Sequence, residues 1–228
     1  DDVWTDHHAK MFCSLPQSGE SGSVVMLTPR IEGLLGSGRP GSLVGEHVLG
    51  SFSDADGETL LRSSVGAAGW QFDDNAKAVL SACDRLPLAI AIVAGGITVD
   101  GPHQSWADVN RAVQSMEAET VVERAIDFNL ASLDPTIREL YLELSIFPED
   151  VWIPLGVLEV YCPHTPVGAV QELSARRLLA IRGDTAFAEI RLHDLQRAYV
   201  RDRTSAAQQQ DLHGRLLSNY QNRIGGSH

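Results

Sequence analysis

The hydrophobic positions of the first fifty residues follow the pattern of a buried strand and a loop. Residues 23–28, SVVMLT, form a continuous apolar run that ends in a polar turn, which is typical of a strand covered on both faces in a parallel sheet. Glycines then cluster around Pro40 between residues 31 and 51, and this predicts a long loop before a short strand over residues 44–49. We therefore expect this part of the chain to belong to an α/β sheet.

From Ser53 the apolar positions take a helical period. Ser53 or Asp54 is placed to cap a first helix, and a second helix is predicted from Asp74 to about Asp84. A third helix is predicted to begin at Pro87, because the missing N–H of proline costs nothing in the first turn, and to end at Gly95-Gly96. Three short helices in succession predict a small helical domain.

The helical period continues in the second half of the chain. One helix is predicted from about Thr120 to Leu130, and Asp134 with Pro135 supplies both the cap and the first turn of the next, which Pro148 ends. The apolar residues of this next helix fall on one face at i, i+3, i+4 and i+7: Ile137, Leu140, Tyr141 and Leu144. Further helices are predicted at 154–161, 166–178 and about 205–222.

A β-hairpin is predicted between the last two of these helices. Within residues 178–192, LLAIRGDTAFAEIRL, Gly183-Asp184 suits a turn, and after it Ala186, Ala188, Ile190 and Leu192 alternate with Phe187, Glu189 and Arg191. Helices followed by a two-stranded ribbon are the winged-helix pattern.

Five short strings stand in a fixed order along the chain. They are Asp1-Asp2-Val3-Trp4, Leu27-Thr28-Pro29-Arg30, Leu86-Pro87-Leu88-Ala89, SIFPED at 145–150 and Leu192-His193-Asp194-Leu195. In this order they resemble motifs of the NB-ARC ATPases of the STAND class, a family that includes apoptotic protease-activating factors, plant resistance proteins and many bacterial signalling ATPases. The first string resembles the Walker B motif, the second the sensor strand, the third the GLPL motif and the last the MHD motif.

The resemblance covers residues 1 to about 203 and implies an architecture that is mostly helical overall. Residues 1–50 would be the remnant of a P-loop NTPase α/β sheet, residues 51–118 a small all-helical domain, and residues 119–203 a winged-helix domain. Residues 204–228 would begin a further helical domain or form a linker. Because the chain starts abruptly at the Walker B motif, we expect it to be a fragment.

Carboxylates at the end of a parallel strand lie where open α/β sheets bind ligands, and magnesium prefers such hard oxygen ligands. By resemblance, Asp1 would hold magnesium through water and Asp2 would orient or activate the attacking water. Thr28 and Arg30 would leave the neighbouring strand, where a guanidinium can report a terminal phosphate. The family usually carries Thr or Ser where Pro29 stands, so the sensor turn departs from the pattern.

The resemblance also assigns nucleotide contacts to the later strings. Pro87 and Leu88 would form a flat wall against adenine. His193 would donate an imidazole N–H to the β-phosphate of ADP and so lock the winged-helix domain over the nucleotide. Asp194 is placed to cap the helix that follows.

The chain contains no GxxxxGK[ST], the loop whose backbone amides and lysine supply most of the phosphate binding in such ATPases. The resemblance implies that the full-length protein binds ADP or ATP with magnesium and is a weak ATPase. We expect this chain alone to be inactive and to bind neither nucleotide tightly.

Composition bears on the partners. The formal net charge is −12, which disfavours nucleic acid, and the longest apolar run, residues 86–97, is too short to span a bilayer. Scattered Cys13, Cys83 and Cys162 suit a reducing compartment, so we expect a cytoplasmic protein. The resemblance further implies self-association on activation, an effector domain before this chain and a sensor domain after it.

Two other interpretations stay open. In one, the chain is a winged-helix DNA-binding regulator whose recognition helix is 166–178, with Arg176 and Arg177 on phosphates. In the other, it is a scaffold that keeps the fold and has lost nucleotide binding.

Overall fold

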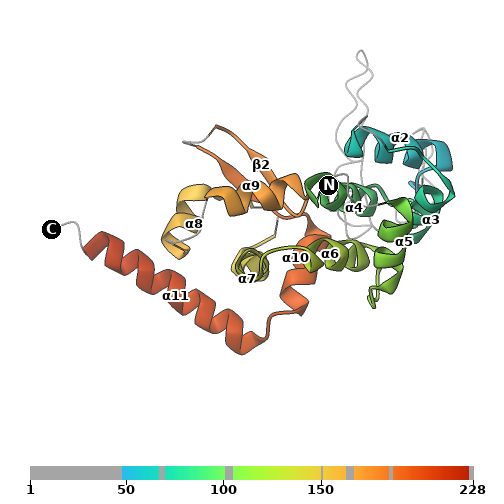
Figure 1. Ribbon diagram of the computed structural model, residues 1–228. Coiled ribbons are helices and arrows are strands. Elements are labelled where there is room, and N and C mark those ends of the chain that lie inside the picture. The colour runs from blue at the N-terminus through green and yellow to red at the C-terminus, as the bar shows by residue number, and fades with distance from the viewer. Residues whose placement is uncertain are drawn as a thin grey trace, which may run out of the picture. The chain divides into compact units, whose positions relative to one another are not determined.

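The computed structural model describes residues 48–66, 70–100, 105–149, 151–162, 167–184 and 187–225. These residues are mostly helical and include one small antiparallel sheet (Figure 1), as expected. The chain divides into two units, Asp1–Gly50 and Ser51–His228, and almost all described residues belong to the second. The strand predicted at 23–28 lies outside the described residues, as does the one predicted at 44–49 apart from residues 48 and 49, which are in no strand.

Polar caps start the first helices of the second unit. These helices are α2 (Asp54–Val65), α3 (Asp74–Ala82), α4 (Pro87–Asp100) and α5 (Trp106–Ser115). The Ser53 hydroxyl accepts from the backbone N–H of Asp56, which confirms Ser53 as the cap of α2. Helix α5 was not predicted, although Ser105 and Asp108 form a reciprocal capping box at its start.

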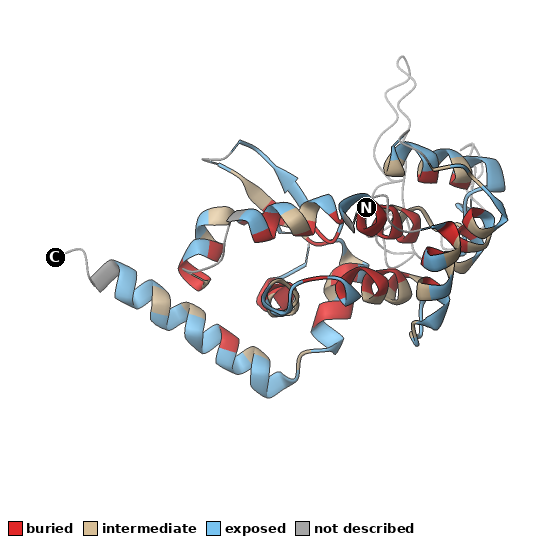
Figure 2. Cartoon of the chain, viewed as in Figure 1, coloured by how far each residue is buried: buried red, intermediate tan, exposed pale blue. Residues whose placement is uncertain are grey.

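Helix α4 lies at the centre of the packing, and α2, α6 and α9 contact it. It is apolar around its whole circumference, which explains its burial, since a helix with no polar face must be covered on all sides. Figure 2 shows it as one of the most buried elements. Its buried residues are at most 1% exposed: Ala89, Ile90, Ile92, Val93, Ala94 and Ile97.

The second half of the unit contains the remaining helices. They are α6 (Val121–Ala131), α7 (Pro135–Glu143), the 3-10 turn η1 (Leu144–Ile146), α8 (Leu155–Tyr161), α9 (Val167–Ala175), α10 (Asp194–Asp202) and α11 (Ala206–Gly225). Thr120 caps α6, and Asp134 with Pro135 starts α7, as predicted. Helix α9 ends earlier than the predicted residue 178, because Arg177 adopts the left-handed conformation at φ 60°.

Helix α11 packs back against α8 and η1. A guanidinium N–H of Arg215 on α11 donates to the Tyr161 hydroxyl at 2.6 Å, and Arg215 also pairs with Glu143. The side-chain amide of Asn219 donates to the Tyr161 carbonyl. No described helix combines the length and the apolar character needed to cross a membrane.

The sheet has three strands rather than the two that the hairpin pattern predicts. Strands β2 (Ala180–Arg182) and β3 (Glu189–Arg191) form the predicted antiparallel hairpin, and β1 (Ile153–Pro154) pairs with the other side of β3. The register places Ile153 and Ile181 on either side of Ile190. A two-residue strand that contains a proline carries no alternation, so the sequence offers no signal for β1.

The prediction that α4 ends at Gly95-Gly96 is wrong, because the helix continues through both glycines. A Cβ at Gly95 would lie 2.5 Å from the carbonyl group of Arg176, and one at Gly96 would lie 2.8 Å from the side-chain oxygen of Asn129. These glycines therefore allow close approach of other backbone and side-chain atoms rather than marking a helix end.

We predict that Gly95→Ala destabilises the fold by about 1–3 kcal/mol, because backbone atoms of Arg176 must move to admit the methyl group. Gly214→Ala is the matched control, since Gly214 lies within α11 with nothing near its Cβ position. It should stabilise by about 0.5–1 kcal/mol through helix propensity. Urea unfolding of both variants measures the difference, and equal effects would show that the contact at Gly95 is not tight.

Alkaline pH should destabilise the fold through Cys83. Burial raises the pKa of this thiol from an ordinary 9.0 to about 12. Between these values the unfolded chain has released the proton and the folded chain has not, so stability falls as pH rises through this window. Urea unfolding at about pH 8 and about pH 10.5 should show a loss that is smaller in Cys83→Ala, by about 2 kcal/mol at most. An identical loss in both proteins would exclude Cys83 as its source.

Candidate functional site

The predicted site residues fall into two groups. Asp1, Asp2, Thr28 and Arg30 lie outside the described residues, and the magnesium position expected at Asp1 lies there too. Pro87, Leu88 and His193 are described. No group of three or more metal-binding side chains occurs among the residues that the structure describes.

Pro87 is the first residue of α4, and both it and Leu88 are half-buried. A tight turn precedes them, in which Asp84 and Arg85 have positive φ angles of 47° and 55°. The Arg85 carbonyl accepts from the backbone N–H of Phe52, and the Arg85 guanidinium pairs with Asp54. The start of α4 is thus tied to the start of α2.

His193 is exposed at the N-terminus of α10 and is itself the N-cap. Its Nδ1 accepts from the backbone N–H of Leu195 at 3.2 Å, so the neutral imidazole carries its proton on Nε2. The prediction that Asp194 caps this helix is wrong, since Asp194 is already the first helical residue.

Gln196 completes a capping box with His193. Its side-chain oxygen accepts from the backbone N–H of His193 at 3.0 Å, and its side-chain N–H donates to the carbonyl of Arg177 at 2.7 Å. Gln196 is 3% exposed, so both ends of a buried amide are satisfied. Sequence reasoning missed it, although a glutamine three residues after a cap is the capping-box signal.

Two of the motif strings are joined by Arg197 on α10. Its Nε donates to the carbonyl of Phe147 at 2.8 Å, and its Nη1 lies 2.9 Å from a carboxylate oxygen of Glu149. The structure therefore brings the segment around His193 together with SIFPED. Pro87 and Leu88 make no direct hydrogen bond to His193 among the described contacts.

Arg176 is buried and serves the fold. It is 3% exposed, its Nε pairs with Glu172 at 3.1 Å, and its Nη1 donates to the Ser132 hydroxyl at 2.9 Å and the Asn129 side-chain oxygen at 3.4 Å. This placement contradicts the hypothesis that Arg176 contacts DNA phosphates, which requires an exposed guanidinium. Arg177 is exposed.

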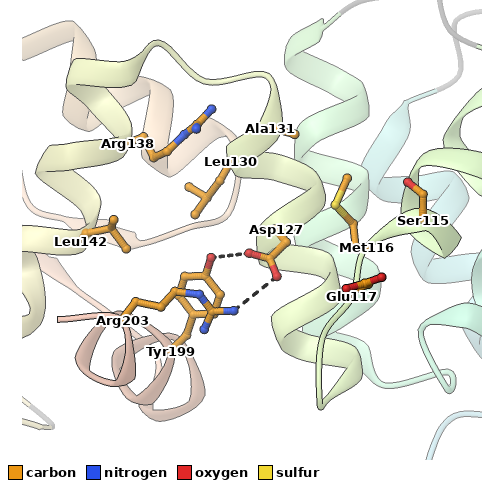
Figure 3. Close-up of a pocket in the computed structure, with 10 residues that line it drawn as sticks. All are labelled: Ser115, Met116, Glu117, Asp127, Leu130, Ala131, Arg138, Leu142, Tyr199 and Arg203. Atoms are coloured by element: carbon orange, nitrogen blue, oxygen red, sulfur yellow. Dashed lines mark hydrogen bonds and ion pairs between the residues drawn. The ribbon is translucent and has the colours of Figure 1, made fainter. Parts of the chain in front are cut away.

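A pocket of about 440 Å³ lies between the end of α5 and helices α6, α7 and α10 (Figure 3), and none of the predicted site residues lines it. Within it the Tyr199 hydroxyl donates to Asp127 at 2.5 Å, and Arg203 pairs with the same carboxylate at 3.3 Å while its guanidinium lies 3.6 Å from the Tyr199 ring centroid. Burial, followed by the hydrogen bond to Asp127, raises the pKa of Tyr199. These groups satisfy one another across α6 and α10.

Comparison with known proteins found two kinds of relative, while no family model matches. Disease resistance protein ADR1 of Arabidopsis thaliana is 29% identical in an alignment 128 positions long, which covers 51% of this chain and 16% of that protein. Apoptotic protease-activating factor 1 of Homo sapiens is 23% identical in an alignment 234 positions long, which covers 97% of this chain and 18% of that protein. A probable disease resistance protein of Arabidopsis thaliana is 31% identical in an alignment 126 positions long, which covers 50% of this chain and 15% of that protein.

The chain is related to the NB-ARC proteins. It spans less than a fifth of the length of each of these relatives. Three of the five NB-ARC-like strings fall at least in part within described residues: the start of α4, the segment from η1 to Glu149, and the junction of β3 with α10.

We predict that Arg176→Met destabilises the fold by about 2–4 kcal/mol, because it removes a guanidinium that makes one buried and two part-buried contacts and leaves the buried side-chain oxygen of Asn129 without that donor. Arg177→Met, one residue later, should change stability by about 0.5 kcal/mol or less, since its side chain is exposed. Chemical denaturation of the two variants side by side gives the comparison. A small effect of Arg176→Met would show that the contacts of this arginine contribute little to stability.

Proposed function

We propose that this chain is the part of a nucleotide-switched signalling protein that follows the phosphate-binding loop. Residues 1–50 are the end of the α/β nucleotide-binding domain, 51–118 a small helical domain, 119–203 a winged-helix domain, and 204–228 the start of a further helical domain or a linker. The unit boundary after Gly50 supports the first of these divisions, and the three-stranded sheet, whose strand β1 contacts α8, supports the winged-helix assignment. The NB-ARC relationship supports the function.

The placement of His193 is the observation that carries the proposal. Its Nδ1 is occupied by the backbone N–H of Leu195, which leaves Nε2–H as a donor on an exposed side chain. The N-terminus of α10 adds the positive end of a helix dipole at the same place. A donor and a positive dipole end together suit the β-phosphate of ADP.

The contact matters because a nucleotide can stabilise one conformation only by binding it more tightly than the other. ADP that contacts both His193 and the nucleotide-binding domain stabilises the closed form, in which the winged-helix domain is locked over the nucleotide. Exchange for ATP, in this proposal, releases the winged-helix domain and allows copies to associate. A charge-assisted hydrogen bond contributes about 1.5–3 kcal/mol, which shifts a balanced equilibrium about tenfold or more.

The proposal also gives each of the other motif residues a role in nucleotide binding. Pro87 and Leu88 form a wall against adenine, Thr28 and Arg30 sense the terminal phosphate, and Asp1 and Asp2 serve magnesium and water. In this proposal the intact protein is a weak ATPase of the cytoplasm. It has an effector domain before this chain and a sensor domain after it. The burial of Arg176 leaves the DNA-binding alternative without one of its two proposed phosphate contacts.

Titration calorimetry of the intact protein with ADP and Mg²⁺ tests the proposal. We expect His193→Ala to weaken ADP binding about tenfold, because one phosphate contact is lost. His213→Ala is the matched control, since His213 is exposed on α11 and belongs to none of the motif strings, and it should leave the affinity unchanged. This 228-residue chain alone should bind ADP more weakly than micromolar, because it contains no GxxxxGK[ST].

Three outcomes would count against parts of this proposal. Equal affinity of the wild type and His193→Ala would remove the phosphate contact. Micromolar binding by this chain alone would show that the phosphate loop is dispensable. An intact protein that neither carries nor binds a nucleotide would favour the scaffold interpretation.

A further inference from the structure

The buried polar side chains of the described residues are few, and most of them belong to one set. Those classed as buried are Asn129, Ser145, Arg176 and Gln196. All except Ser145 take part in hydrogen bonds at the corner between α9 and β2. Since an apolar side chain would cost less at a buried position, such a set specifies geometry when every member is satisfied.

Two amide side chains hold two successive backbone carbonyls at this corner. The side-chain N–H groups of Asn129 donate to the carbonyl of Arg176 at 3.2 Å and to the carbonyl of Ile92 on α4. The side-chain N–H of Gln196 donates to the carbonyl of Arg177, and its oxygen accepts from the backbone N–H of His193. A continuous series of contacts thus runs from α4, through Asn129, the corner and Gln196, to the N-cap of α10.

The backbone of the corner, at Arg176 and Arg177, is constrained in two ways. Arg177 holds a left-handed φ of 60°, which directs its carbonyl away from the helical path. On the α4 side, the Arg176 carbonyl approaches so closely that only glycine fits at position 95. Neither carbonyl can therefore shift without disturbing α4 or α10.

We propose that Gln196 is the positioning residue for His193, and that with Asn129 it fixes the imidazole relative to the helix that begins at Pro87. The inference rests on the proposed contact between His193 and ADP. Gln196 holds the His193 backbone in the cap conformation in which Nδ1 accepts from Leu195 and Nε2–H is left for the phosphate. Without that hold, the imidazole must be ordered when the nucleotide binds, and this ordering weakens binding.

The test is a double-mutant cycle on the intact protein, with ADP and Mg²⁺ affinity measured by calorimetry. Gln196→Met keeps the length of the side chain and removes both hydrogen bonds. We expect it to weaken ADP binding about three- to tenfold in the wild-type background. In the His193→Ala background it should have no further effect, because it acts only through that imidazole. Gln196→Asn, one methylene shorter, cannot reach both partners and should repeat the loss.

Gln208→Met is the matched control for helix capping. Gln208 makes the same type of capping box on α11, where its side-chain oxygen accepts from the backbone N–H of Ser205 at 2.9 Å. It removes the same contact at the start of a helix and should leave ADP affinity unchanged, which separates positioning of His193 from the loss of a helix cap as such. Thermal unfolding confirms that each variant is folded.

The outcomes separate this inference from the proposed function. If His193→Ala leaves ADP affinity unchanged, the proposed contact fails and the positioning role falls with it. If His193→Ala weakens binding and both Gln196 variants bind like the wild type, only the positioning role is wrong. Additive effects of Gln196→Met and His193→Ala, or variants at Gln196 that do not fold, would reduce Gln196 to a structural residue.

Discussion

The burial of most of α4 between Ala89 and Ile97 is the constraint on which the rest of the unit depends. Because this helix has no polar face, α2, α6 and α9 must cover it, and these elements come from both halves of the unit. A hydrophobic interface of this kind is strong and has little directional preference. Burial alone therefore holds the elements together without setting how they slide or rotate against one another.

Polar contacts and glycines fix how the helices are placed against one another. The side-chain amide of Asn129 on α6 donates to a carbonyl of α4. The Arg176 carbonyl after α9 lies so close to Gly95 that a Cβ at this position would clash with it. Both features lie in the interior, where an unsatisfied amide or a displaced backbone is costly. The relative placement of α4, α6 and α9 is thus specified by a few atoms within a large apolar surface.

The success of the sequence predictions depended on whether a feature is local. Helix starts at Ser53, Thr120 and Asp134 were predictable because the cap and the N–H groups that it accepts from are a few residues apart. The role of Gly95 was not predictable, since a glycine that lets a distant part of the backbone approach has the same local sequence pattern as a glycine that ends a helix. The third strand was missed for the same reason, because its pairing partner lies far along the chain.

The candidate site divides in the same way. Motif order indicated the NB-ARC relationship and singled out His193, but Gln196 emerged only once its contact across the corner was known. The motif residues Asp1, Asp2, Thr28 and Arg30 lie outside the described residues and stay predictions. A motif in the sequence singles out a candidate binding residue such as His193 more easily than the side chain, here Gln196, that contacts its backbone.

The edges of the small sheet have a consequence for pairing with further strands. Its two outer strands are β1, which contributes a proline without an N–H, and β2, which has only three residues and ends in a charged arginine. Natural sheets use short edges, prolines and charges to resist edge-to-edge pairing. Both edges of this sheet are therefore poor templates for a further strand, whether it comes from another copy of the chain or from a different protein.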